Sequence, residues 1–384
     1  MLMKDFSFSI PQNVRFGLGA LKKLSEITNE KNFKKAYVIS GPNLKKSGLV
    51  DICEHILFKS GVKSMSFTET EGNPSVETVE KAAEGFRLSG ADFIVAFGGG
   101  SPIDVAKAVA VLVTHGGKVA DYEGVGKVPG PVVPVIAIPT TAGTGSEVTA
   151  FSVITDHSRN YKLTIGSNYL IPEYAILDPE LIMSVPRGTA AACGIDAFVH
   201  ALEAYISKGS SPFSDMFAKK ALNLIGKNIK RYIESRIDAN ACEAMMLGSL
   251  FAGIAFSHAR LGDVHAMSHP VSAYFNVPHG VANAILLPAV VDFNMECAKD
   301  KYLYIYNCIA ETPVSEISFS PDMLAAEIRI FEHELGIPSS LSEVGVNSDL
   351  FAKMADDAMK SGNINVNPRY TSKADLLMLY EAAY

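Results

Sequence analysis

The chain has 384 residues, enough for one large unit or two domains of ordinary size, and its 48% hydrophobic and 20% charged residues are typical of a globular protein. This composition excludes a disordered or fibrous chain, and five scattered cysteines without a C-x-x-C pair exclude a disulfide-rich miniprotein. The formal charge of −7, with no strong clustering of Lys and Arg, excludes nucleic acid as a partner.

The N-terminal residues MLMKDFSFSIPQ lack the apolar core of a signal peptide. No stretch of the sequence approaches the ~18 consecutive apolar residues of a membrane span. An odd number of widely spaced cysteines is typical of reduced thiols. We therefore expect a cytoplasmic protein without a membrane partner.

The first half of the chain alternates short apolar runs with segments of helical periodicity. Three runs are apolar without period-2 alternation and are predicted as strands covered on both faces, at residues 36–40, 93–97 and 132–138. Helices are expected at residues 44–60, 75–89 and 102–113. Strands that alternate with helices predict a parallel sheet, because parallel neighbours need a crossover connection. This half is predicted to be α/β and Rossmann-like.

The second half of the chain is predicted to be helical. Apolar residues recur at helical spacing in residues 189–207, 214–235 and 239–257. We place a domain boundary near residue 185, which divides the chain into an α/β domain, 1–185, and a helical domain, 186–384. No low-complexity linker separates these halves, so they are expected to pack closely and share a cleft.

A glycine triplet follows the second predicted strand. Gly98–Gly100 precede Ser101, which is expected as the N-cap of a helix, with Pro102 in its first turn and Asp104 completing a capping box. Because glycines have no Cβ atoms, an anion can approach the backbone N–H groups at the positive end of the helix. The triplet predicts a pyrophosphate site, and a tight turn without a ligand is the alternative.

A second polar loop follows the third predicted strand. Residues 139–149 carry five hydroxyl side chains and two glycines, which is more hydrogen-bonding capacity than a turn needs. Ligands of open parallel sheets bind beyond the carboxyl ends of the strands, where both loops begin. Together the two loops favour a nucleotide site.

Histidines cluster in the helical half, where five of the nine lie between residues 200 and 279. Asp196 and His200 are four residues apart on a predicted helix, as are His265 and His269, so each pair shares one helical face. His279 follows a proline and is expected at the start of the next helix.

One carboxylate and three imidazoles suit Zn²⁺ or Fe²⁺ and leave coordination positions open for substrate. We predict a catalytic metal site formed by Asp196, His200, His265 and His279, because two such four-residue pairs in one domain rarely arise without a ligand. For any single histidine, the alternative is a partly buried ring whose hydrogen bonds are satisfied within the protein, without a metal. His258 could line the same pocket without contacting the metal.

Several segments resemble the iron-containing (group III) alcohol dehydrogenases. They are GGGSPIDVAKA (98–108), PTTAGTGSEVT (139–149), GIDAFVHALEAYIS (194–207) and VHAMSHPVSAYFNVPHGVANAILLP (264–288). The resemblance continues into LGIPSSLSEVGV (335–346) and NPRY (367–370), so it covers nearly the whole chain.

The resemblance implies a dehydroquinate synthase-like arrangement, with a nucleotide domain, a helical metal domain and the active site between them. It implies that Asp196, His200, His265 and His279 are the metal ligands. It also implies a set of cofactor-binding positions: Asn73, Gly99, Gly100, Ser101, Asp104, Thr140, Thr141, Thr144, Thr149 and Lys162. We add Gly41 to this cofactor-binding set because of its place after the first predicted strand.

Two departures from the family pattern stand out. Many NAD-using relatives carry an Asp after the first strand to bind the ribose 2′-OH, whereas this chain has Gly41 with Lys45 and Lys46 nearby. We therefore hypothesise that NADP(H) is accepted and preferred over NAD(H). In addition, smaller or neutral residues of relatives are replaced by His258, Arg260 and Asp263, which would change the substrate range if these side chains reach the pocket.

The predicted reaction is reversible hydride transfer between a primary alcohol and the nicotinamide of NADP or NAD. The cofactor metal is expected to be Fe²⁺, with Zn²⁺ as the alternative, acting as a Lewis acid on the substrate oxygen. His269 is the candidate for a catalytic proton relay, and a place in the pocket wall is its alternative. We expect a homo-oligomer, a dimer or larger.

Three other functions fit parts of the sequence. A glycerol dehydrogenase-like polyol oxidoreductase, or a dehydroquinate synthase, shares the expected fold but has less similar motifs. A metal-dependent hydrolase would leave the glycine-rich and threonine-rich loops without a role. A non-enzymatic binding or scaffold protein would leave the open metal-ligand set unexplained.

Overall fold

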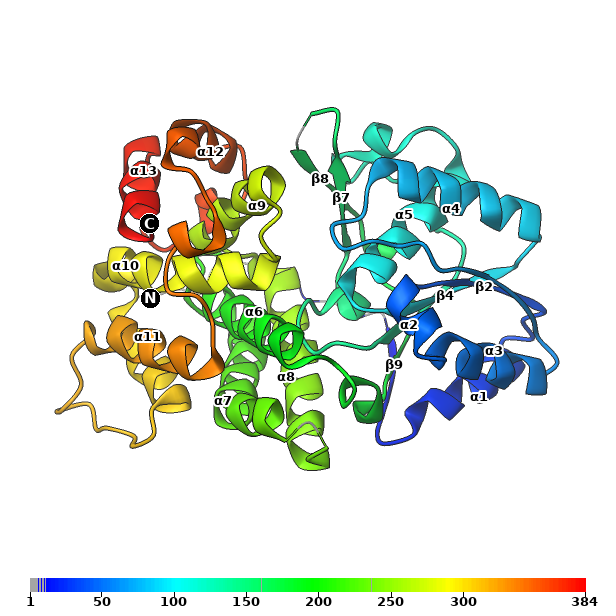
Figure 1. The fold of residues 1–384 in the computed structure, drawn as a ribbon, viewed down its shortest axis with the longest axis horizontal. Coiled ribbons are helices and arrows are strands. Elements are labelled where there is room, and N and C mark those ends of the chain that lie inside the picture. Colours follow the sequence, from blue (N-terminus) through cyan, green and yellow to red (C-terminus); the bar gives the residue numbers. More distant parts are fainter. Residues whose placement is uncertain (1–5, 7, 9, 11, 160, 236) are drawn as a thin grey trace. The chain divides into compact units, whose positions relative to one another are not determined.

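The computed structural model describes residues 6, 8, 10, 12–159, 161–235 and 237–384. The chain forms two compact units. The α/β unit comprises Ile10–Thr141 and Gly145–Val185, blue to green in Figure 1. The helical unit comprises Pro186–Tyr384, to which Ala142–Thr144 and the described N-terminal residues Phe6 and Phe8 also belong.

The α/β unit is built on a parallel sheet. Within its described residues the main sheet has six strands in the order β1-β9-β6-β4-β2-β3, and every neighbouring pair is parallel. The strands are β1 (Asn13–Phe16), β2 (Lys35–Ile39), β3 (Lys63–Phe67), β4 (Phe93–Gly98), β6 (Val135–Pro139) and β9 (Tyr174–Leu177). The predicted parallel α/β fold is confirmed. The third predicted strand begins three residues late, after Pro134, which has no N–H for a strand ladder.

Both faces of this sheet are covered, which explains the absence of polar alternation in its central strands. In β2, Tyr37 and Ile39 belong to one buried cluster and Ala36 and Val38 to the other. The first cluster includes apolar residues of α4 (Val76–Ser89) and α5 (Gly100–His115), and the second those of α1 (Lys23–Glu30) and α3 (Leu49–Lys59). Figure 1 shows these two helix pairs on opposite faces.

Two parts of the α/β unit differ from the sequence predictions. The helix predicted over 44–60 is broken into α2 (Pro42–Lys46) and α3, because Gly48 takes a left-handed φ of 82° between them. A second sheet was not predicted and contains β5 (Gly124–Val125), β7 (Phe151–Asp156) and β8 (Tyr161–Gly166), with β7 and β8 antiparallel.

The helical unit confirms the predicted helical second half. Its helices are α6 (Arg187–Ile206), α7 (Pro212–Glu234), α8 (Ala239–Ala259), α9 (Asp263–Phe275), α10 (His279–Ile309), α11 (Met323–Leu335), α12 (Phe351–Ala358) and α13 (Lys373–Ala382). As expected, His265 and His269 share one helix, α9, and His279 is the first residue of α10.

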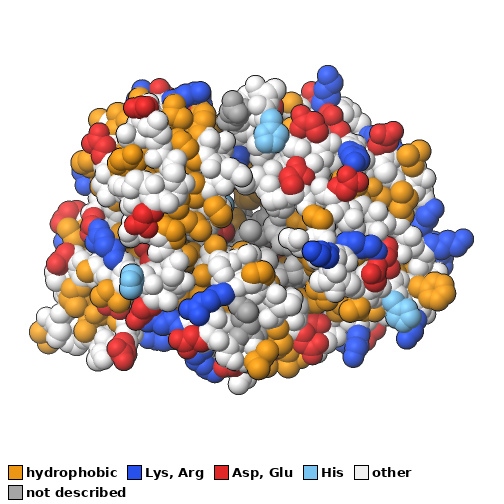
Figure 2. All heavy atoms as spheres, viewed as in Figure 1, with side chains coloured by type: hydrophobic (Ala, Val, Ile, Leu, Met, Phe, Trp, Pro, Cys, Tyr) orange, Lys and Arg blue, Asp and Glu red, His pale blue; other side chains and the backbone are white. Residues whose placement is uncertain are grey.

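Helices α8 and α10 are long and apolar enough to cross a bilayer by length and composition alone. However, 67% and 72% of their most apolar windows are buried inside the protein, as is typical of core helices. On the face shown in Figure 2, Lys and Arg side chains are interspersed with Asp and Glu.

Gly226 tests the close packing of α7 against α10. A Cβ at Gly226 would come 2.4 Å from the backbone carbonyl oxygen of Cys308. We expect Gly226→Ala to lower the free energy of unfolding by about 1–3 kcal/mol through overpacking. The sign of this change is diagnostic, because Gly→Ala at an uncrowded helix position raises the free energy of unfolding by roughly 1 kcal/mol. Urea unfolding measures the effect.

Gly188, in the first turn of α6, is the matched control. A Cβ there meets no atom within 4 Å, so Gly188→Ala should leave stability unchanged or raise it. Equal stability of the Gly226→Ala and Gly188→Ala variants would contradict the close approach of α7 to α10.

Candidate functional site

Helix α6 carries three buried polar side chains on one face. Asp196, His200 and Glu203 are spaced by four and three residues, which places them in a row along the helix. Their exposed fractions are only 3%, 5% and 2%. Buried charges need partners, so this row requires polar groups from neighbouring helices.

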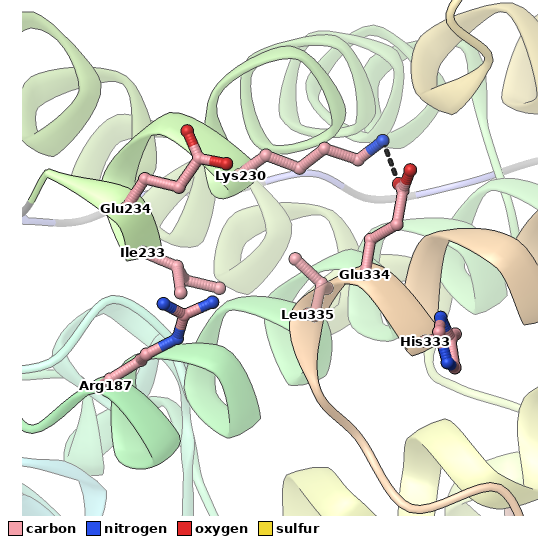
Figure 3. Close-up of a pocket in the computed structure, with 7 residues that line it drawn as sticks. All are labelled: Arg187, Lys230, Ile233, Glu234, His333, Glu334 and Leu335. Carbon is pink, nitrogen blue, oxygen red and sulfur yellow. Dashed lines mark ion pairs between the residues drawn. The ribbon is translucent and has the colours of Figure 1, made fainter.

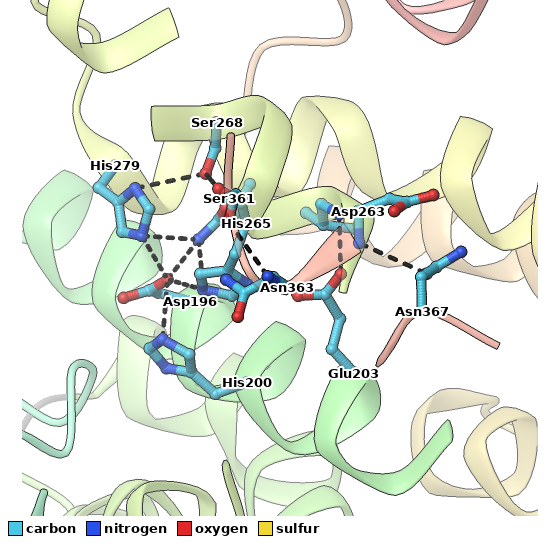
Figure 4. A network of polar contacts seen from close by, with 12 residues as sticks. Asp196, His200, Glu203, Asp263, His265, Ser268, His279, Ser361, Asn363 and Asn367 are labelled. Carbon is cyan, nitrogen blue, oxygen red and sulfur yellow. Dashed lines mark hydrogen bonds and ion pairs between the residues drawn. The ribbon is translucent and has the colours of Figure 1, made fainter. Parts of the chain in front are cut away.

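Those groups come from α9 and α10. One carboxylate oxygen of Asp196, Oδ1, lies 3.8–4.0 Å from the Nε2 atoms of all three predicted histidine ligands, His200, His265 and His279. The ligand atoms of Asp196, His265 and His279 lie within 4.8 Å of one another. His200 lies outside this mutual group but stacks on His265 with ring centroids 4.6 Å apart. The structure thus brings the three predicted histidine ligands around one oxygen atom of the fourth, Asp196 (Figure 4).

The spacing of these atoms suits a small divalent cation. Metal–ligand bonds of about 2.1 Å in a tetrahedron separate neighbouring ligand atoms by about 3.4 Å, a few tenths of an ångström less than the distances to Asp196 Oδ1. Three imidazole nitrogens and one carboxylate oxygen are a donor set for Fe²⁺ or Zn²⁺. The four side chains therefore fit the expected metal.

The approach of α10 to α6 is close where the cluster forms. A Cβ at Gly280 would come 2.0 Å from the carbonyl oxygen of Ala192 and 3.2 Å from Cβ of Asp196. A glycine directly after His279 is therefore necessary for this approach, because any side chain would separate the two helices.

The protonation of the cluster follows from burial and charge. Burial raises the pKa of Asp196, but the imidazoles of His200, His279 and His265 outweigh it and hold the pKa well below its ordinary value. Burial lowers the pKa of His200 to about 4. Burial also disfavours charge on His265, yet Asp196 and Glu203 raise its pKa to about 9. A divalent cation would compete with protons for these ligand atoms.

Three supporting side chains were not identified from the sequence. Asn283 Nδ2 donates to Asp196 Oδ1 at 2.6 Å, Glu203 Oε2 lies 2.5 Å from His265 Nδ1, and Ser268 Oγ lies 3.5 Å from His279 Nδ1. Helical spacing was a usable signal for two of them. Asn283 is four residues after His279, and Glu203 is three after His200.

His269 lies beside the cluster. Its ring stacks on His279 with centroids 5.3 Å apart, it lies 6.5 Å from the His265 ring, and it is half-buried. It is therefore close to the cluster and partly accessible.

The three unusual residues near the end of α8 make other contacts. The His258 ring packs against Phe8 in a tilted arrangement, with ring centroids 4.1 Å apart. Asp263 is fully buried and its Oδ2 accepts a hydrogen bond from Thr371 Oγ1 at 2.6 Å. Arg260 is exposed, and its guanidinium packs against Gly362. Asp263 is thus bound to the C-terminal segment.

In the α/β unit, the glycine-rich loop caps α5 in a different way from the prediction. The helix begins at Gly100 with Gly99 as N-cap and no side-chain cap, so Ser101 and Asp104 do not form the expected capping box. Asp104 is drawn away because its carboxylate accepts from Ser146 Oγ at 2.5 Å and from the Val153 N–H at 3.0 Å. The first turn of α5 therefore keeps its backbone N–H groups for another acceptor.

Lys107 links this helix to the second polar loop. Its fully buried Nζ donates to Ser146 Oγ, Thr149 Oγ1, Thr149 O and Phe151 O at 2.8–3.1 Å. Burial lowers the pKa of Lys107 to about 8. Asp104 and Thr149, predicted as cofactor contacts, thus hold the two loops together from inside.

The other predicted cofactor positions are distributed over both units. Gly99, Gly100 and Ser101 are half-buried at the start of α5. A Cβ at Gly99 would lie 3.3 Å from Thr141 Oγ1, and the Thr140 N–H donates to the Gly98 carbonyl at 3.0 Å. Lys162 Nζ donates to Asn73 Oδ1 at 2.8 Å, which joins β8 to the segment before α4. Thr144 belongs to the helical unit.

Gly41 follows β2, next to Ser40 in sequence and close to Thr70 in space. Among the described atoms, Ser40 Oγ and Thr70 Oγ1 have no hydrogen-bond partner, and a Cβ at Gly41 would lie 3.2 Å from Thr70 O. Lys45 is paired with Asp51 and lies 3.6 Å from a carboxylate oxygen of Glu54. Its charge is therefore partly compensated.

A surface hollow of about 440 Å³ in the helical unit contains none of these groups (Figure 3). Arg187, Lys230 and His333 line it together with Glu234 and Glu334. Lys230 and Glu334 form an ion pair across it. Because its charges are mixed and internally paired, this hollow does not indicate a ligand site.

Comparison with known proteins identifies the relatives of the chain. The family described as iron-containing alcohol dehydrogenase matches residues 11–179, and the C-terminal part of the Fe-containing alcohol dehydrogenase family matches residues 190–384. The 1,3-propanediol dehydrogenase of Klebsiella pneumoniae is 35% identical over 100% of both chains. The NAD-dependent methanol dehydrogenase of Bacillus methanolicus is 34% identical, over 98% of this chain and 99% of that one.

Solved structures agree with these sequence matches. A crystal structure of 1,3-propanediol oxidoreductase has a TM-score of 0.95 and 35% identity, and the match covers 99% of this chain and 100% of that one. These comparisons confirm the family resemblance and the fold predicted from the sequence, and they give no support to a hydrolase.

The buried carboxylate at the centre of the cluster is the most direct test of metal binding. We expect Asp196→Asn to weaken Zn²⁺ or Fe²⁺ binding by more than the 10–100-fold typical of outer contacts, because the charged ligand is lost. Metal analysis after dialysis and titration against a chelator measure the loss.

Glu332→Gln is the control, because Glu332 is another buried carboxyl of the helical unit, on α11. It should retain the metal affinity of the unmodified chain. Equal affinities for Asp196→Asn and Glu332→Gln would contradict the assignment of Asp196 as a ligand.

Proposed function

This chain belongs to the iron-containing alcohol dehydrogenase family, whose members are metal-dependent, NAD(P)-linked alcohol and aldehyde oxidoreductases, and we propose that it interconverts primary alcohols and aldehydes by direct hydride transfer. A polyol oxidoreductase is a closely similar function, and the relatives that act on 1,3-propanediol favour small substrates of this kind. We also propose a soluble, cytoplasmic homo-oligomer, a dimer or larger.

A single observation carries the proposal. Oδ1 of the buried carboxylate of Asp196 is surrounded by three imidazole Nε2 atoms at 3.8–4.0 Å. A buried negative charge needs compensating positive charge, and a divalent cation among these atoms is the partner that the donor set favours.

The proposed reaction needs a bound metal ion, a bound nicotinamide cofactor and side chains of the protein. When bound, the divalent cation supplies Lewis acidity to the substrate oxygen, and the nicotinamide accepts or returns the hydride. Asp196, His200, His265 and His279 would hold the cation. Asn283 donates to Asp196 and thereby fixes the orientation of the carboxylate.

His269 is proposed as the proton relay. It stacks on His279 and is half-buried, so it is next to the cluster and still partly accessible. A group in this place can take the alcohol proton or return it.

The cofactor is proposed to bind the α/β unit. The open first turn of α5 supports a pyrophosphate site, because its N–H groups have no side-chain cap. The hydroxyls of Ser40 and Thr70 beside Gly41 support binding of the adenosine ribose or its 2′-phosphate. Without a carboxylate at position 41 we propose a preference for NADP(H). NAD(H) is the alternative, since one relative is named NAD-dependent and the positive charge of Lys45 is partly compensated by Asp51 and Glu54.

An assay of the purified, Fe²⁺-loaded chain tests the activity. We expect consumption of NAD(P)H with small aldehydes such as 3-hydroxypropanal, and the reverse reaction with the matching alcohols. His269→Ala should keep its bound iron but lose most of the turnover, since only the proton route is removed. Absence of turnover with every aldehyde tried, in protein that retains iron, would refute the proposed function.

Gly41→Asp tests the cofactor preference. We expect the new carboxylate to raise the KM for NADPH at least tenfold, because it repels the 2′-phosphate, and to lower the KM for NADH. Gly41→Asn is the control, since it adds a side chain of the same size without the charge. A lower KM for NADH than for NADPH in the unmodified chain would contradict the proposed preference.

A further inference from the structure

We propose that Glu203 is a positioning residue for the metal centre: its carboxylate binds Nδ1 of His265 and directs Nε2 of that ring toward the cation. This inference rests on the proposed metal site. It assigns a role to a residue that is not one of the four ligands.

Glu203 reaches this place because of its spacing on α6. It follows Asp196 by seven residues and His200 by three, so all three side chains point toward the same neighbouring helices. Its side chain is 2% exposed, and a carboxylate so deeply buried requires hydrogen-bond donors. Figure 4 shows Glu203 directed toward the start of α9.

Two donors from the first turn of α9 meet the carboxylate. Oε1 accepts the Val264 N–H at 2.7 Å, and Oε2 lies 2.5 Å from His265 Nδ1. The N-cap of α9 is Gly262, which has no side chain to cap the helix. A Cβ there would lie 2.9 Å from Glu203 Oε1, so the glycine provides the space that Glu203 occupies. Glu203 therefore caps α9 and holds His265 at the same time.

The contact with Nδ1 determines which nitrogen can bind a metal. An ionised carboxylate only accepts hydrogen bonds, so we assign the proton of His265 to Nδ1 when the ring is neutral. The lone pair is then on Nε2, which lies 3.8 Å from Asp196 Oδ1. The ring is thus held in the tautomer and orientation that coordination requires.

Glu203→Gln is the informative variant. Its side chain has nearly the same size, but only one of its two terminal atoms accepts hydrogen bonds, whereas both Val264 N–H and His265 Nδ1–H need an acceptor. We expect Zn²⁺ affinity, measured by competition with a chromophoric chelator, to fall by 10–100-fold. The visible absorption bands of the Co²⁺-loaded protein should also shift, because the ligand field changes with the orientation of His265.

Thr371→Val separates this role from a general stabilisation of the start of α9. Thr371 Oγ1 donates to Asp263 Oδ2 at the same end of α9, and its other hydrogen-bond partners among the described residues are Asn367 and Arg369, not a proposed ligand. The variant should lower the melting temperature while Zn²⁺ affinity stays within twofold and the Co²⁺ bands stay unchanged. If both variants lose affinity in proportion to their loss of stability, and the bands move in neither, Glu203 is merely structural and the inference is overturned.

A measurement on the unmodified, Zn²⁺-loaded chain decides the question even if Glu203→Gln does not fold. We expect ¹⁵N-histidine NMR, with His265 assigned through a His265→Gln variant, to show an Nδ1 proton that exchanges slowly with water. A rapidly exchanging proton, or one on Nε2, would overturn the inference. Failure of the unmodified chain to bind Zn²⁺, Co²⁺ or Fe²⁺ would instead refute the proposed metal site.

Discussion

The structure of the helical unit depends on the burial of one carboxylate. Asp196 is 3% exposed, and an isolated charge in such a place would be strongly destabilising. Imidazoles from α9 and α10, and another from α6 itself, converge on its Oδ1 atom. Helices far apart in the chain are therefore bound together through a polar centre, which is costly to disturb and specific in geometry.

The α/β unit contains a comparable polar core built on a cation. Lys107 lies on the buried face of α5, and its ammonium group is bound by oxygens of the segment 146–151. Asp104, one turn earlier on α5, accepts hydrogen bonds from Ser146 and from Val153, just beyond this segment. The two loops proposed to bind the cofactor are thus joined beneath the surface, so their backbones are positioned before any ligand arrives.

Much of this arrangement could be predicted from the sequence. Spacing of four residues placed Asp196 with His200, and Pro278 located the start of α10 at His279. The partners of buried polar groups could not be predicted, since they depend on distant contacts. Lys107 lies in an apolar helix whose sequence does not indicate its oxygen partners, and Asp104 had a plausible local role as a cap. The hairpin of β7 and β8 was detectable, because YKLTIG alternates apolar and polar residues.

The close approach at Gly280 has a consequence for engineering the enzyme. Directed-evolution libraries that randomise the neighbourhood of His279 to alter substrate choice would include this position by proximity. Every non-glycine codon there would place a side chain against the α6 backbone and move His279 away from Asp196. Such clones would fail as metalloproteins before any effect on selectivity could be screened, so position 280 is better kept constant.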